Sequence, residues 1–127
     1  MEDFVKEYLY GVILIKVNLT RATLREAQEL KQILEEEITI QHKKLVLDIS
    51  QCEFIDSTFF GVLIFEHKKM IASGGILNIV RPINTNGNFL HLTQVLDYLN
   101  MYETRSEAVE YFDKNIPIQN KNLNKNE

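Results

Sequence analysis

The stretch that decides the fold is KLVLDISQCEFIDSTFFG, residues 44–61. It opens with a short apolar run over residues 45–49, a pattern typical of a strand covered on both faces of a sheet. It closes with Asp56, Ser57 and Thr58, directly before a segment whose apolar residues recur at helical spacing. The sequence therefore predicts a buried strand that delivers a hydroxyl group to the start of a helix. Unpaired N–H groups and the positive end of the helix dipole make that point favourable for an added phosphate.

Further strands are predicted on both sides of this stretch. Residues 4–8 and 12–17 form a predicted hairpin with a turn at Gly11. Residues 76–80 and 99–102 have the apolar composition of two later strands. From the second strand on, strands alternate with helices, which indicates parallel neighbours joined by right-handed crossovers. The predicted fold class is therefore α/β, with a mixed, mostly parallel sheet of four to five strands and an N-terminal hairpin.

The first predicted helix begins at a capping box, TLRE at residues 23–26. It is expected to end at Glu37 or Ile40, with the consecutive glutamates at 35–37 forming a solvated face.

Three more helices complete the expected set of about four. The helix over residues 57–72 is expected to end at Gly74 and Gly75, which suit a left-handed C-cap. A short helix is predicted over residues 89–96, and a second capping-box spacing at residues 104–107 starts a last one.

Length and composition limit the possible classes of protein. With 127 residues, 45% of them hydrophobic, the chain suits one compact domain over residues 1–113. Residues 114–127 are rich in asparagine and lysine and are expected to be a disordered polar tail. The net charge of −4 argues against direct binding to nucleic acid. The lone Cys52 and the short apolar run at residues 12–15 favour a cytoplasmic protein without a membrane span.

No catalytic motif is evident. His42, His67 and His91 show no metal-ligand spacing with Cys52, and neither a nucleophile elbow nor a phosphate-binding glycine loop is present. His67 follows Ser57 by ten residues on the predicted helix, roughly 15 Å along its axis, too far to be its general base. We therefore expect neither an enzyme nor a cofactor. Cys52 is either a thiol with a lowered pKa or a small apolar residue, and the second interpretation is favoured.

The segment KLVLDISQCEFIDST, followed by Gly61 and Val62, resembles the STAS family of anti-sigma factor antagonists. The hallmark of that family is a strand, then Asp-Ser-(Ser or Thr), then a glycine-bearing helix start. LHLTQV at residues 90–95 is similar to the pattern of the family's penultimate helix, and residues 102–112 are similar to its closing helix. The resemblance implies a single STAS-like domain.

The resemblance also implies a function. In that family, the serine directly after the aspartate is phosphorylated by a partner that is both a GHKL-type serine kinase and an anti-sigma factor. By position this serine is Ser57, with Thr58 as the alternative acceptor. The unmodified protein binds the anti-sigma factor and so frees the sigma factor, the phosphorylated form is released, and a PPM-type phosphatase resets the switch. Transcription would thus be regulated indirectly.

Other interpretations stay open. Ser57 is a preferred helix starter and could serve only as an N-cap, while Asp56 could be a turn residue or could orient the hydroxyl. The domain could instead be a scaffold or subunit that docks to another complex without phosphorylation. Homodimers through the edge of the N-terminal hairpin are a further alternative.

The sequence departs from the family pattern beside the expected switch. Phe59 replaces the usual glycine and Phe60 the usual leucine. Phe60 can fill the core position of the leucine, so Phe59 is expected to point outward beside Ser57, as an aromatic anchor for a partner or an obstacle to a kinase. The family's glycine- and aspartate-containing loop is replaced by residues 18–23. The predicted partner surface comprises Asp56, Ser57, Thr58, Phe59, Gly61, Arg21 and Thr23.

Overall fold

The computed structural model describes residues 2–83 and 99–115. Its centre is a mixed five-stranded sheet in the order β1-β2-β4-β6-β7. β1 pairs antiparallel with β2, and the β2–β4, β4–β6 and β6–β7 pairs are all parallel. The predicted α/β fold class and the N-terminal hairpin are confirmed. The strands are β1 (Phe4–Leu9), β2 (Val12–Val17), β4 (Lys44–Asp48), β6 (Ile76–Val80) and β7 (Asn100–Tyr102).

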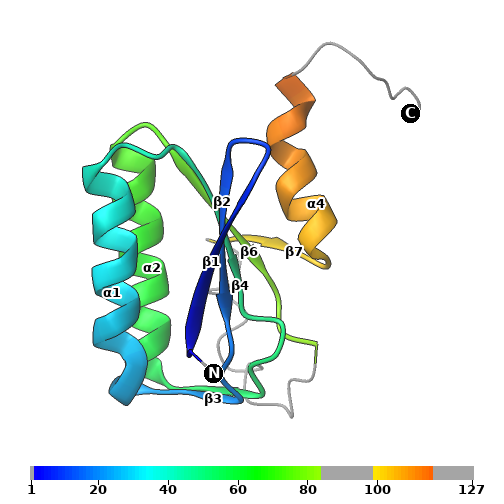
Figure 1. The fold of residues 1–127 in the computed structure, drawn as a ribbon. Helices are drawn as coiled ribbons and strands as arrows, with labels where there is room; N and C mark the ends of the chain where they lie inside the picture. The colour runs from blue at the N-terminus through cyan, green and yellow to red at the C-terminus, as the bar shows by residue number, and fades with distance from the viewer. Residues whose placement is uncertain (1, 84–98, 116–127) are drawn as a thin grey trace.

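Helices cover both faces of the sheet (Figure 1). α1 (Leu24–Thr39) and α2 (Ser57–Ala72) lie side by side on one face. α4 (Arg105–Glu110) lies on the other face and continues into a 3-10 segment, Tyr111–Asn115. The helix predicted over residues 89–96 and the polar tail from residue 116 on lie outside the described residues.

Alternating side chains in the strands divide the core into two layers. One set packs under α1 and α2, and the other packs under α4, as expected for a sheet covered on both faces. The first layer includes Ile13, Ile15, Leu45, Leu47, Leu77 and Ile79. The second layer includes Val12, Leu14, Val46, Val80, Ala108, Val109 and Phe112.

A second, two-stranded sheet was not predicted. β3 (Arg21–Ala22) pairs in parallel with β5 (Phe54–Ile55). The backbone of Glu53 donates to the carbonyl of Thr20 at 2.8 Å, which extends the pairing. These short strands directly precede α1 and α2, so the two helices begin at the same end of the molecule (Figure 1). Two-residue strands carry no periodic signal, which explains why the sequence did not indicate them.

The turn and cap predictions are largely confirmed. Tyr10 and Gly11, with φ of 52° and 81°, form the hairpin turn. Thr23 and Glu26 form the predicted capping box of α1. Gly74 has a φ of 90° just after α2, a conformation that favours glycine.

The expectation that Glu37 belongs to a solvated face is wrong. Its side chain is fully buried between α1 and the hairpin edge, where it contacts Lys6 and where its Oε1 lies 2.5 Å from His42 Nδ1. Burial alone would raise the pKa of Glu37, but the bonds from Lys6 and His42 outweigh it and hold that pKa below its usual range. The buried glutamate keeps its charge because the partly exposed side chains of Lys6 and His42 reach its two oxygens.

Candidate functional site

Asp56 organises the start of α2. It is the N-cap residue, and its Oδ1 accepts a hydrogen bond from the N–H of Phe59 at 2.8 Å. Its Oδ2 accepts one from the N–H of Leu24, the first residue of α1, also at 2.8 Å. One carboxylate therefore satisfies free N–H groups at both helix starts. The interpretation of Ser57 as an N-cap is wrong, because Asp56 occupies that position.

Ser57 and Thr58 are the first two residues of α2, and both are exposed. Within the described part of the chain, neither hydroxyl group takes part in a hydrogen bond given by the structure. The hydroxyls are therefore not required to hold the helix in place. They lie at the positive end of the α2 dipole, where an added anion is favoured.

The small sheet brings the predicted loop residues to the same place. Arg21 is exposed and its guanidinium lies 4.3 Å from the ring centroid of Phe54, a cation–π contact. Thr23 caps α1 next to Leu24, which Asp56 contacts. The structure thus places Arg21 and Thr23 beside the start of α2.

The prediction for Phe59 is wrong. Its side chain is 0% exposed and belongs to the core under α1 and α2. Phe60, at 3% exposure, is buried as predicted. Because both rings lie in the core, Phe59 cannot be an exposed anchor for a partner. It is a packing residue.

The exposed aromatic residue of α2 is Phe65, which was not singled out from the sequence. It lies outside the apolar stripe of the predicted helix, and that departure from periodicity is the signal that could have identified it. Phe65 borders a groove of about 270 Å³ between α1 and α2. The groove is lined by Lys31, Thr58, Gly61, Val62, Phe65 and Glu66.

Gly61 borders open space in the groove, close to Ser57 and Thr58. A Cβ atom built on it would meet no other atom within 4 Å, so the space above it is empty. Thr58 lies three residues earlier, on the same side of the helix. The predicted site residues Thr58 and Gly61 therefore share one groove that runs from the helix start toward Phe65.

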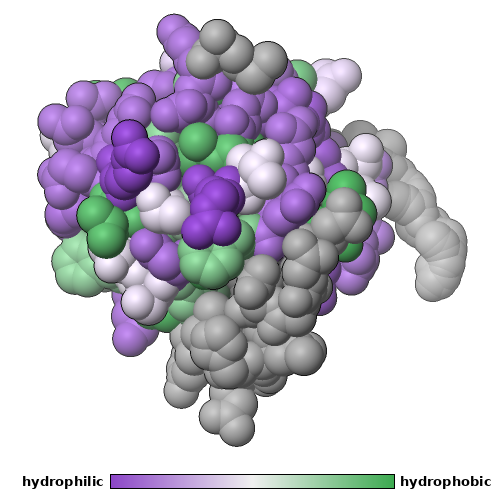
Figure 2. Space-filling view, turned by 90° about the horizontal axis from the view of Figure 1, so that it is seen from below, coloured by the Kyte–Doolittle hydropathy of each residue, from purple (hydrophilic) through white to green (hydrophobic). Residues whose placement is uncertain are grey.

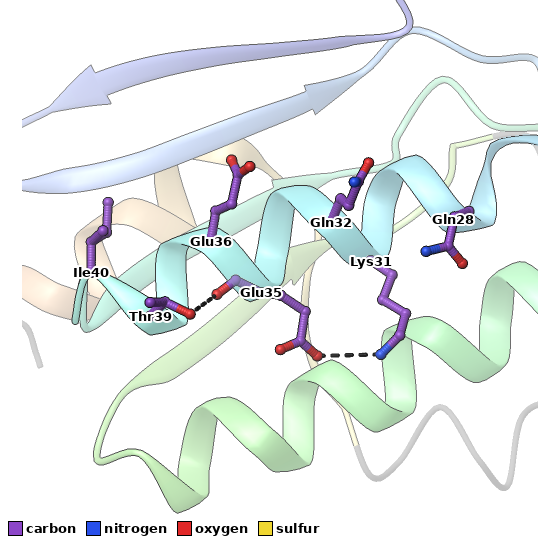
Figure 3. A pocket seen from close by; sticks show the side chains of 7 residues that line it. All are labelled: Gln28, Lys31, Gln32, Glu35, Glu36, Thr39 and Ile40. Atoms are coloured by element: carbon purple, nitrogen blue, oxygen red, sulfur yellow. Dashed lines mark hydrogen bonds and ion pairs between the residues drawn. The ribbon is translucent and has the colours of Figure 1, made fainter.

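Charged residues of α1 and α2 meet along this groove. Figure 3 shows Lys31 and Glu35 extending from α1 toward α2, where Glu35 contacts Lys69. Lys31 Nζ lies 3.4 Å from Glu35 Oε2 and 3.7 Å from Glu66 Oε2. The interaction with the adjacent carboxyl of Glu66, followed by the contacts with Lys69 and Lys31, lowers the pKa of Glu35 to about 2. Burial, followed by the adjacent Glu35, raises the pKa of Glu66 to about 7.

Figure 3 also shows a shallow depression of about 320 Å³ along α1. Residues of this single helix line it, and most of them are polar. A depression formed by one helix holds no converging groups, so we assign it no role.

Figure 2 views the molecule from the end at which β3 and the starts of α1 and α2 lie. Hydrophobic and hydrophilic residues are interspersed on this face. Leu24, 64% exposed, contributes apolar surface at the start of α1. Mixed surfaces of this kind are typical of transient protein–protein contacts.

Cys52 is a structural residue. Its side chain is fully buried, and burial, with a smaller contribution from the charge of Asp48, raises the pKa of the thiol to about 12. The thiolate needed for reactivity is therefore disfavoured. The interpretation of Cys52 as a small apolar residue is confirmed.

The described residues contain no group of three His, Cys, Asp or Glu side chains that could hold a metal ion. In the same part of the chain, no helix combines the length and apolar character that crossing a membrane requires.

The fold and the site define a class of protein. It is a single α/β domain in which the start of one helix carries two exposed hydroxyl groups and is hydrogen-bonded through one carboxylate to the start of the neighbouring helix. The STAS domain family model matches residues 12–108, and the chain belongs to that family. A Thermotoga maritima protein that carries the provisional name anti-sigma factor antagonist is 32% identical over 80 residues, which are 63% of this chain and 71% of that protein.

Solved structures agree with this assignment. The crystal structure of an anti-sigma factor antagonist from Thermotoga maritima, also provisionally named, has a TM-score of 0.71 at 26% identity and covers 85% of this chain and 92% of its own. SpoIIAA in its unphosphorylated form has a TM-score of 0.67 at 14% identity, with 91% and 99% covered. The phosphorylated form of the Bacillus protein gives 0.64 at 14% identity, with 86% and 98% covered. At this identity, the two SpoIIAA structures show a shared fold.

Proposed function

We propose that this STAS domain is a cytoplasmic anti-sigma factor antagonist switched by phosphorylation of Ser57, with Thr58 as the alternative acceptor. The observation that carries the proposal is the start of α2, where Asp56 performs the capping and leaves both hydroxyls exposed. The provisional name of the Thermotoga maritima relative supports the antagonist role. The proposed partner is a GHKL-type anti-sigma kinase, and a PPM-type phosphatase removes the phosphate.

The physical effect of phosphorylation is local. A phosphoryl group adds about −1.5 to −2 charges and three acceptor oxygens to an interface residue. The N-terminus of α2 accommodates this charge without rearrangement of the domain. Arg21, Thr23, Thr58 and Gly61 surround the position, so a partner that contacts them meets the new charge directly. Release then follows from lost complementarity at one surface, without unfolding of the domain.

The test uses the full chain with the GHKL-type kinase that co-purifies with it and ATP. We expect mass spectrometry to place the phosphate on Ser57, and Ser57→Ala to abolish that modification. Ser57→Asp should weaken kinase binding at least about tenfold in calorimetry, since a negative charge at an interface core is costly. The matched control is Ser106→Asp, an exposed serine of α4 on the opposite face of the sheet, which should leave binding unchanged.

The proposal fails if no phosphate appears on Ser57 or Thr58 and Ser57→Asp binds the kinase as tightly as the unmodified chain. The alternative of a docking subunit without phosphorylation drew support from an exposed Phe59. Because that ring is buried, this support is lost.

A further inference from the structure

The groove between α1 and α2 contains one buried carboxyl group without a hydrogen-bond donor. The Glu66 side chain is 0% exposed and lines the groove of about 270 Å³. Among the described residues, no donor hydrogen-bonds to either of its oxygens. The nearest ammonium group, Lys31 Nζ, lies 3.7 Å from Oε2, beyond hydrogen-bond distance. A buried carboxylate left in this state is costly, so the site suits a ligand that supplies donors.

Lys31, which lines the groove, and the neighbouring Lys69 both contact Glu35. Lys31 Nζ lies closer to Glu35, at 3.4 Å, and Lys69 contacts the other oxygen of Glu35. Glu35 thus has two cationic partners. Among the described residues, the cation paired with Glu66 is Lys31, at 3.7 Å, and Lys31 lies closer to Glu35. The described residues leave Glu66 available to a partner.

Phe65 supplies the second contact surface of the groove. It is 53% exposed, and its ring already faces cations, with Lys31 Nζ 4.9 Å and Lys69 Nζ 5.9 Å from the centroid. A planar guanidinium can lie on an aromatic ring while it donates two parallel hydrogen bonds to a carboxylate. A carboxyl group and an exposed ring in one groove therefore match arginine better than any other side chain. The net charge of −4 also favours a basic partner surface.

We propose that this groove is a subsite for an arginine side chain of the protein partner, with the guanidinium paired to Glu66 and stacked on Phe65. The inference rests on the proposed function, because Thr58 and Gly61 line the same groove and a partner held at the start of α2 reaches it. It adds one chemical feature of the partner that recognition of the helix start does not require.

Binding in this subsite is coupled to a proton. The guanidinium pairs with ionised Glu66, whereas burial and the neighbouring Glu35 raise the pKa of Glu66 to about 7, against the opposing charges of Lys31 and Lys69. Below that pKa, Glu66 must release its proton when the arginine arrives. Affinity should therefore fall about tenfold between pH near 8 and pH near 6.

The experiment is an NMR titration of the isotope-labelled full chain with N-acetyl-arginine methylamide. The matched probe is the citrulline analogue, which keeps the shape of the side chain and lacks its charge. We expect saturable shifts at Lys31, Phe65 and Glu66 with the arginine probe near pH 8, much weaker shifts with citrulline, and weaker arginine binding near pH 6. Glu66→Gln should abolish the arginine-dependent shifts, and Phe65→Ala should weaken them. The control Glu29→Gln, an exposed glutamate of α1 outside the groove, should not change them.

The proposal is overturned if Glu66→Gln keeps the arginine-dependent shifts, if citrulline binds as well as arginine, or if no residue of the groove responds. The spectrum of each variant reports whether it is folded, and Phe65→Ala alters an exposed ring and so provides a second folded variant. The titration uses neither kinase nor ATP. Its failure would leave the phosphorylation switch standing, and failure of the switch would leave the subsite standing.

Discussion

Asp56 shows how a single side chain can leave the neighbouring hydroxyl groups free of a capping role at the candidate site. Its two oxygens accept hydrogen bonds from Phe59 and Leu24, each at 2.8 Å. Because this carboxylate caps one helix and connects it to the other, the hydroxyl of Ser57 has no structural task in the described part of the chain. A phosphate can therefore be added or removed at Ser57 without loss of a cap, which a reversible switch requires.

The sequence predicted that Phe59 is an exposed aromatic residue of α2. The structure instead buries Phe59 and exposes Phe65. Phe59→Ala should lower the free energy of unfolding by about 3–5 kcal/mol, because it empties a fully buried position. Phe65→Ala should cost less than about 1 kcal/mol, since that ring is half exposed. Urea unfolding followed by circular dichroism measures both values. A stable Phe59→Ala variant that had lost only partner binding would contradict the assignment of Phe59 to the core.

At the scale of elements, α1 and α2 act as one unit. Thr23 and Asp56 fix their starts together, and the contacts of Glu35 with Lys31 and Lys69 connect their middles. Glu66 lies between the helices with its charge unbalanced by a close partner. The helix pair should therefore respond to pH through Glu66.

The free energy of unfolding should depend on pH because of the raised pKa of Glu66. The fold raises the pKa of Glu66 from 4.5 to about 7, so the folded state holds this proton more tightly than the unfolded chain. The resulting stabilisation is fully present below pH 4.5 and is lost as the pH rises through 7. Glu66→Gln keeps the neutral hydrogen-bonding group at every pH, so its advantage over the natural chain should grow by up to about 3 kcal/mol between pH near 4.5 and pH near 8.

Denaturant titrations across this pH range measure the difference. A difference that stays constant would show that Glu66 has an ordinary pKa in the fold.

Glu35 affects stability in a more acidic pH range. Its pKa is lowered to about 2, so its contribution is present above pH 4.5 and is lost as the pH falls toward 2. The two effects therefore occupy separate pH windows.

At the scale of the whole molecule, an ion pair connects α4 to the end of the central strand β4. Arg105 of α4 donates from Nη2 to Asp48 Oδ2 at 2.8 Å, at the end of the central strand β4. Burial opposes ionisation of Asp48, but hydrogen bonds from Ser50 and the bonds and charge of Arg105 outweigh it and lower its pKa. The pair holds the short α4 against a sheet whose other face carries the site.

Arg105→Ala should destabilise the domain by about 1–2 kcal/mol near neutral pH, because it leaves a buried carboxylate without its cation. The lowered pKa of Asp48 means that this contribution is present above pH 3.8 and is lost as the pH falls through the folded-state pKa. The difference should therefore shrink in acid. Thermal unfolding at several pH values measures it.

The control is Arg81→Ala, which removes an exposed pair with Glu103. It should cost less than about 1 kcal/mol at any pH, since solvent screens exposed pairs. Equal losses for Arg105→Ala and Arg81→Ala would show that the Asp48 pair has no special role in holding α4.

The sequence alone determined the features that depend on local pattern. Short apolar runs placed β2 and β6 at their observed bounds, and a period of 3.6 together with capping residues placed α1 and α2. The Asp-Ser-Thr triplet located the candidate switch at the start of α2. These features follow from residues within a few positions of one another, so no tertiary contact is needed to predict them.

Tertiary structure alone decided which way individual side chains face. Phe59 turned inward and Glu37 became buried, because packing against distant strands determines burial. The β3–β5 pair and the second hydrogen bond of Asp56 join segments about thirty residues apart. The groove at Glu66 exists only where α1 meets α2. Burial and pairing between distant segments leave no periodic trace in either segment, so the sequence indicated where the candidate switch lies and the fold decided what surrounds it.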